Sequence, residues 1–107
     1  MSFAAGQPAA AIAFDLSEVD DNGLIGPEDG KRAVDYEYCV PDNTDIRAEV
    51  RAIDPSAVFM ARSRGRIGCR DDEILVLGNS HQPDFRSILR RLAALPFVQR
   101  IEQAFFE

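Results

Sequence analysis

The chain lacks most of the residues and motifs that mark common functional sites. Its 107 residues include no tryptophan, one histidine, one lysine and two cysteines. One histidine and two cysteines without a C-x-x-C spacing do not complete a four-ligand zinc site. The sequence also has no Walker loop and no G-x-S-x-G, H-E-x-x-H or G-x-G-x-x-G motif. We therefore expect no cofactor, and we favour a non-catalytic protein over an enzyme.

Long apolar runs are missing as well. No run approaches the roughly 20 residues that a membrane-spanning helix needs, and the first 14 residues contain no basic residue, which makes them a poor secretory signal. These absences predict a soluble, cytoplasmic protein that does not act on membranes. Because thiols stay reduced in the cytoplasm, we expect Cys39 and Cys69 to be buried free thiols within apolar segments.

The charge is unevenly distributed along the chain. The formal net charge is −6, and residues 1–50 hold 11 acidic residues against only Lys31, Arg32 and Arg47. Residues 51–107 hold nine arginines against seven acidic residues. An acidic half repels phosphate backbones, so direct nucleic-acid binding is not expected. An alternative is that the acidic half mimics nucleic-acid charge and inhibits a nucleic-acid-handling protein.

Alternating and helical patterns predict the secondary structure. Side chains alternate between apolar and polar where we expect strands, and apolar residues recur at helical spacing where we expect helices. Asn43 or Thr44 is the expected N-cap of the first helix, and Pro83 suits the first turn of the second. The predicted elements are strands 11–19 and 34–40, helix 44–53, strand 57–61, a hairpin of 66–70 with 73–78 around Asp71-Asp72, helix 83–95 and strand 97–106.

From residue 33 onward this order is β-α-β-β-α-β, which predicts a ferredoxin-like α+β fold. In that fold two helices pack on one face of an antiparallel sheet. We expect a single domain over residues 1–107, in which residues 1–33 supply an extra N-terminal strand and an acidic loop and residues 34–107 form the core. The fold hosts many unrelated activities and does not fix a function.

The stretch EVDDNGLIGPED resembles a calcium-binding loop in its spacing alone. With Gly23 at the sixth position of such a loop, its candidate ligands are Glu18, Asp20, Asn22 and Asp29. The flanking helices of that motif are missing, and Glu and Asp stand at its two ends with the wrong side-chain lengths. We therefore expect a solvated turn and no metal site.

A second candidate is a binding site for a small anion or metabolite. In the predicted hairpin Arg64 lies opposite Asn79, so its basic residues approach the start of the second helix, where backbone N–H groups favour anions. The candidate residues are Arg64, Arg66, Asn79, Ser80 and His81. The alternative is an exposed bend whose arginines pair with acidic residues, with Asn79 or Ser80 serving as a helix cap.

The remaining candidate is a protein interface. Tyr36, Tyr38 and Val40 share one face of a predicted strand, opposite Asp35, Glu37 and Cys39. If the first set lies on the helix-free face of the sheet, it forms an apolar surface for a protein partner or a homodimer. The alternative is that the tyrosines face the helices. The sequence thus predicts a small acidic binding or regulatory module that acts through protein–protein association.

Overall fold

The computed structural model describes residues 12–104 and shows a mixed α+β protein. This part contains two α-helices, a four-stranded antiparallel sheet and a two-stranded antiparallel sheet. None of its helices is long and apolar enough to cross a membrane. In chain order the elements are η1 (Leu16–Glu18, a 3-10 helix), β1 (Leu24–Ile25), β2 (Arg32–Ala33), β3 (Asp35–Pro41), α2 (Thr44–Ile53), β4 (Val58–Met60), β5 (Glu73–Asn79), α3 (Phe85–Ala93) and β6 (Ile101–Gln103).

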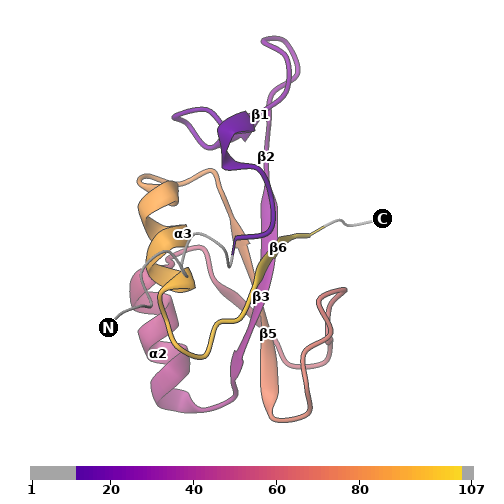
Figure 1. Cartoon of the computed structure of the whole chain (residues 1–107), viewed down its shortest axis with the longest axis vertical. Helices are drawn as coiled ribbons and strands as arrows, with labels where there is room; N and C mark the ends of the chain where they lie inside the picture. The colour runs from indigo at the N-terminus through magenta and orange to yellow at the C-terminus, as the bar shows by residue number, and fades with distance from the viewer. Residues whose placement is uncertain (1–11, 105–107) are drawn as a thin grey trace, which may run out of the picture.

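The larger sheet has different coverings on its two faces. Its strands lie in the order β4-β5-β3-β6, and every neighbouring pair is antiparallel. Figure 1 shows α2 and α3 together on one face of this sheet and the connection between β4 and β5 on the other. We call that connection, residues 61–72, the covering loop, and we call the face beneath it the helix-free face.

The side-chain alternation of β3 decides which residues form the core. Tyr36, Tyr38 and Val40 are each 0% exposed and pack with apolar residues of α2 and α3. These three side chains face the helices, so the predicted interface of Tyr36, Tyr38 and Val40 is corrected: none of them is available to a partner. The opposite set, which includes Glu37 and Cys39, lies on the helix-free face because successive strand residues point to opposite sides.

Helix α2 begins and ends for local reasons. The Asn43 side chain accepts the backbone N–H of Ile46 at 2.8 Å and so caps α2 as expected. Asp54 follows the last residue of α2, and Pro55 lacks the N–H that a further helical turn requires. The inner side of α3 buries five residues: Phe85, Ile88, Leu89, Leu92 and Ala93.

The N-terminal segment does not form the predicted strand. Ile12 makes a single parallel bridge to Ile101, and the chain then turns into η1. Asp15 explains the turn, because its side chain accepts the backbone N–H of Ser17 at 2.9 Å and competes with strand pairing. Ala11 and, at the other end, the Phe105 and Phe106 of the predicted closing strand lie outside the described residues.

The predicted hairpin around Asp71-Asp72 is also wrong. The partner of β5 is β4, in a register that pairs Phe59 with Val76. Residues 65–68 form a turn in the covering loop, and residues 69–70 have no regular secondary structure. Gly65 and Gly68 adopt φ values of +66° and +81°, a backbone conformation that does not fit a regular strand.

Candidate functional site

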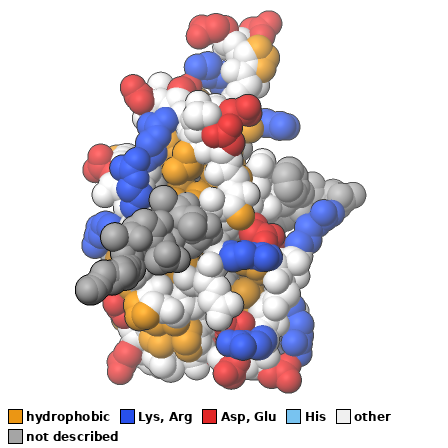
Figure 2. Space-filling model, in the orientation of Figure 1, with side chains coloured by type: hydrophobic (Ala, Val, Ile, Leu, Met, Phe, Trp, Pro, Cys, Tyr) orange, Lys and Arg blue, Asp and Glu red, His pale blue; other side chains and the backbone are white. Residues whose placement is uncertain are grey.

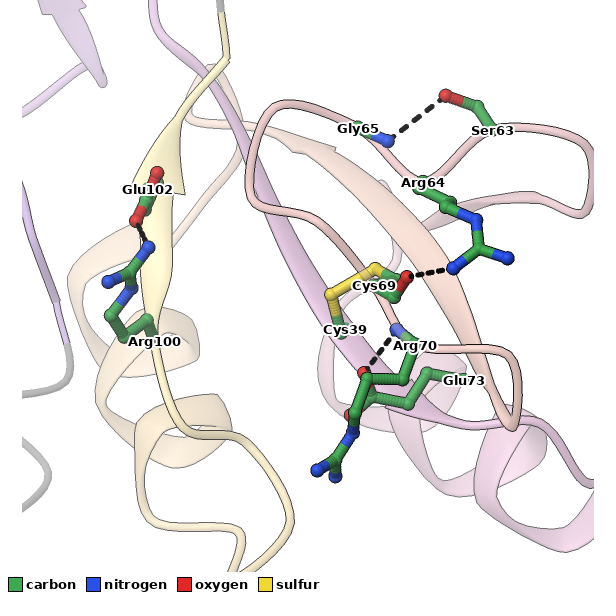
Figure 3. Close-up of a disulfide and its surroundings, with 9 residues drawn as sticks. All are labelled: Cys39, Ser63, Arg64, Gly65, Cys69, Arg70, Glu73, Arg100 and Glu102. Carbon is green, nitrogen blue, oxygen red and sulfur yellow. Dashed lines mark hydrogen bonds and ion pairs between the residues drawn. A yellow bond between two sulfur atoms is a disulfide. The ribbon is translucent and has the colours of Figure 1, made fainter.

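A disulfide fixes the covering loop to the helix-free face. Cys39 of β3 and Cys69 of the loop are joined, with their Cα atoms 5.5 Å apart (Figure 3). The expectation of two free thiols is therefore wrong. The sequence does not predict that these two cysteines are close in space, because 30 residues separate them. Arg64 stabilises the same loop by donating to the carbonyl of Cys69 at 3.3 Å and by pairing with Asp71.

Beside the covering loop, the helix-free face contains a hollow of about 670 Å³. Leu75 and Leu77 of β5 and Met60 of β4 supply its apolar surface, and charged residues of the loop form its rim. This volume lies in the usual range of ligand-binding clefts, about 300–1,000 Å³. The residues that line the hollow are Glu37, Met60, Arg62, Ser63, Arg64, Gly65, Arg66, Leu75, Leu77 and Ala104.

Glu37 is the buried charged group of this hollow. Its side chain lies under the covering loop, and the residue is only 3% exposed. One carboxylate oxygen, Oε2, has no hydrogen-bond partner. Burial raises the pKa of the Glu37 carboxyl, and the charge of Glu102, its direct neighbour on β6, raises it further; backbone N–H groups of Ile67 and Arg66 act in the opposite direction. A buried carboxyl with a shifted pKa inside a hollow is typical of functional sites.

The raised pKa predicts a pH dependence of stability. Because the folded protein holds the Glu37 proton to a higher pH than the unfolded chain does, the folded state binds more protons in between. Stability contributed by this group is therefore present below the unfolded carboxyl pKa of about 4.3 and is lost as the pH rises through the folded pKa. We expect wild type to lose stability relative to Glu37→Gln as the pH rises above the ordinary carboxyl pKa, measured by urea unfolding at several pH values.

The matched variant for this test is Glu102→Gln. It removes the neighbouring charge and leaves Glu37 in place, so the pH-dependent difference should shrink without disappearing. A stability difference that instead favours wild type increasingly as the pH rises would contradict the assignment.

The five residues of the predicted anion site do not come together as expected. Arg64 and Arg66 lie in the covering loop, at the rim of the hollow, whereas Asn79 ends β5 and pairs in register with Asp35. The side chain of Asn79 also donates to Asp35 at 2.8 Å. The expected approach of Arg64 to Asn79 depended on the hairpin register, which the β4–β5 pairing replaces.

Ser80 and His81 have structural contacts with the acidic turn. The Ser80 hydroxyl, 1% exposed, donates to the carbonyl of Gly23 and accepts the backbone N–H of Val34. His81 Nδ1 lies 3.0 Å from the carbonyl oxygen of Asn22, so this nitrogen is the donor of the pair. Asp21 lines the adjoining pocket with His81, and its charge disfavours an anion there.

The residues of the predicted calcium loop hold a turn. Asp20 accepts the backbone N–H groups of Asn22 and Leu24 with one oxygen and pairs with Lys31 at 2.6 Å through the other. The hydrogen bond from Lys31 lowers the pKa of Asp20 to about 2. Glu18 belongs to η1, and Asp29 lies at the exposed tip between β1 and β2. Within residues 12–104 no group of three or more His, Cys, Asp or Glu side chains is placed to hold a metal ion.

A buried polar cluster on the helix side was not predicted from the sequence. Asp54 is 0% exposed, and its Oδ2 accepts the hydroxyls of Tyr36 and Tyr38 at 2.9 and 3.0 Å. Its Oδ1 accepts from Ser56 and from the side-chain amide of Gln82. Burial, together with the charge of Asp54, raises the pKa of both phenols, so the two tyrosines are hydrogen-bond donors in the folded protein. The cluster is enclosed and joins β3, α2 and the start of α3, which makes it a structural centre.

Comparisons with known proteins assign no role to any of these sites. No protein-family model, no curated protein and no solved structure matches the chain.

Proposed function

We propose that this protein is a non-catalytic binding module that takes an extended, acidic and partly apolar segment of a partner protein on its helix-free face. The observation that supports the proposal is the hollow beside β4, in which an apolar surface meets an arginine-rich rim. This proposal keeps protein–protein association as the function and replaces the tyrosine surface with the opposite face of the same sheet.

The apolar part of the surface is exposed at the end strand of the sheet. Val58 is 53% exposed and Met60 is 36% exposed. Among the described residues, these two are the most exposed large hydrophobic residues. Both belong to β4, which stands at the end of the strand order, so one side of its backbone has no neighbouring strand among residues 12–104. An extended segment can add to such an edge through main-chain hydrogen bonds, with alternate side chains in adjoining hollows.

The charged part of the surface favours an acidic occupant. Arg62, Arg64 and Arg66 line the hollow along the covering loop, where Arg64 also pairs with the exposed Asp71. Figure 2 shows several basic side chains, with acidic ones among them, along the lower right of the molecule, where Figure 1 draws this loop. Arginine forms forked hydrogen bonds with carboxylates, so an acidic segment is the complementary partner.

The proposal can be tested with model peptides that alternate valine with glutamate or with lysine. We expect the glutamate peptide to bind at low ionic strength and to shift the amide NMR signals of β4 and the covering loop. Arg62→Glu should weaken this binding by about tenfold or more, because it replaces an attraction by a repulsion. The lysine peptide should not bind measurably under the same conditions.

The control for this experiment is Arg91→Glu, which makes the same charge change at an exposed position of α3, on the other side of the sheet. Its affinity for the glutamate peptide should equal that of wild type. Equal weakening by both variants, or signal shifts confined to the β1–β2 end, would overturn the proposed surface. Light scattering after size exclusion separates the remaining alternative, in which a second copy of the chain occupies the face.

The topology supports a finer description of the fold. The chain order β3-α2-β4-β5-α3-β6, the sheet order β4-β5-β3-β6 and two helices on one face are features of the ferredoxin-like arrangement. We propose that residues 35–103 adopt this arrangement.

The disulfide bears on the compartment. Cytoplasmic thiols are normally kept reduced, whereas disulfides persist in oxidising environments. The Cys39–Cys69 bond therefore favours an oxidising compartment over the cytoplasm expected from the sequence.

A further inference from the structure

The two sulfur-bearing residues of the disulfide differ in their access to a second pocket. This pocket, of about 290 Å³, is lined by Cys39 but not by Cys69, and it lies between the covering loop and the segment that leads into β6. Cys39 is partly exposed, whereas Cys69 is 2% exposed. A small molecule in this pocket therefore meets Cys39 first. The lining residues are Cys39, Ile67, Gly68, Arg70, Glu73, Phe97, Gln99 and Arg100.

Two arginines give this pocket its charge. Figure 3 shows Arg70 on the covering-loop side of the disulfide and Arg100 across from it on the β6 side. Arg70 pairs with Glu73 at 3.7 Å and Arg100 pairs with Glu102, and the two arginine side chains are 70% and 58% exposed. Exposed ion pairs of this kind are weak, so both guanidinium groups can exchange their partner for the carboxylate of a ligand. Glu73 is the one acidic residue of the lining; its side chain is 12% exposed, and its Oε1 already accepts the backbone N–H of Arg70 at 2.8 Å.

We propose that Cys39 is a thiol-exchange site for small thiols that carry a carboxylate. A thiolate is the attacking form in disulfide exchange, and neighbouring arginines favour both the thiolate and a carboxylate on the same molecule. The apolar part of such a thiol is accommodated by Ile67 and Phe97. This site is separate from the proposed peptide surface and does not depend on it.

The exchange proceeds in two balanced steps. In the first, the sulfur of the external thiolate forms a bond to Sγ of Cys39, the Cys39–Cys69 bond breaks, and Cys69 leaves as a thiolate. In the second, another external thiolate attacks the sulfur of the bound external thiol in the mixed disulfide and releases the Cys39 thiolate. The external thiol is thus oxidised to its disulfide while the protein disulfide is reduced. Cys69 is the leaving group because Cys39 lines the pocket and Cys69 does not, so a thiolate in the pocket attacks Sγ of Cys39.

The test compares two small thiols on the folded protein without denaturant. The protein is incubated with 3-mercaptopropionate or with cysteamine at equal thiolate concentration, then quenched by alkylation and mapped by peptide mass spectrometry. We expect the mixed disulfide on Cys39 and the alkyl label on Cys69. We also expect the ratio of the anionic to the cationic rate to exceed, by up to about tenfold, the same ratio measured on a small uncharged disulfide, because the lining carries two arginines against Glu73 and a cleft of net positive charge attracts anions. The small disulfide is the reference for intrinsic reactivity, since a thiolate of higher pKa is the stronger nucleophile.

Charge variants and ionic strength show whether the pocket causes this preference. Arg70→Gln and Arg100→Gln should each reduce the ratio of the two rates, and high salt should reduce it in wild type. The matched control, Arg91→Gln on α3, should leave the ratio unchanged. If the adduct forms on Cys69, if the rate ratio on wild type equals the ratio on the small uncharged disulfide, or if exchange needs denaturant, the proposal is overturned; these three outcomes do not depend on how well any variant folds.

Discussion

Replacing Asp54 with alanine is expected to lower the free energy of unfolding by about 3–5 kcal/mol, because it leaves buried donors without an acceptor. The hydroxyl of Tyr38 donates to Asp54, and the hydroxyl of Tyr36 shares the same oxygen. Each buried polar group that loses its partner costs about 1–3 kcal/mol. Since a domain of this size has a total stability of about 5–15 kcal/mol, the loss is a large fraction of it. Urea unfolding at neutral pH measures the change.

Two further variants separate the hydrogen bonds from the mere loss of a charge. Asp72→Ala removes an aspartate from an exposed turn and should change stability by no more than about 0.5 kcal/mol. The double-mutant cycle of Asp54→Ala with Tyr38→Phe should show a coupling of about 0.5–3 kcal/mol, because the two side chains share one interaction. An Asp54→Ala protein within about 1 kcal/mol of wild type would mean that the cluster does not stabilise the fold.

The elements that the sequence predicts well are those whose signals are local. Strand 34–40 was predicted and the structure has β3 over Asp35–Pro41, since alternation extends over the whole strand. The helix predicted over 44–53 is α2 with the expected cap, because Asn43 and the Asp54-Pro55 pair act within a few residues of their own positions. In both cases the same short segment contains the cause and its effect.

The elements that the sequence mispredicts depend on partners far along the chain. Alternation alone does not specify which face of β3 packs against the helices. In the structure it is the face that carries Tyr36. Local turn signals favoured pairing residues 66–70 with β5, but β4 occupies that position. A pairing between distant strands leaves no signal within either segment, whereas Asp71-Asp72 is a local turn signal that does not specify which strand pairs with β5.

The candidate site could be predicted only in part, because it too depends on contacts between residues that are distant in the sequence. Arg64 and Arg66 are predicted to lie at an anion site through a hairpin register that the structure replaces, and both line the hollow instead. Glu37 was assigned to the face opposite the tyrosines, yet its burial under the covering loop depends on Gly65, whose backbone passes over that carboxyl. An added Cβ at Gly65 would come within 2.5 Å of Glu37 Oε1, so the glycine allows the loop to approach this closely. The run RSRGR is the signal that could have indicated this approach.

Replacing both Cys39 and Cys69 with alanine is expected to lower the free energy of unfolding by about 3–4 kcal/mol, the loop-closure estimate for a link across 30 residues. The link restricts the unfolded chain and holds the covering loop to β3, so its loss acts on both states. For a domain of this length the melting temperature should fall by roughly 10–20 °C. Thermal unfolding of the double variant and of wild type, each with and without reductant, measures the effect.

The reductant gives this experiment an internal control. Reduced wild type should melt close to the double variant, and the double variant should be unaffected by reductant, since the described chain has no cysteine outside this bond. Hydrogen exchange should locate the change: the amide of Gly68, which donates to the carbonyl of Arg64 within the covering loop, should exchange faster, while that of Val76 at the centre of the sheet should keep its relative protection. A double variant as stable as oxidised wild type would show that Glu37 and the packing of Leu75 hold the loop without the sulfur bridge, because these are the contacts that remain beneath it.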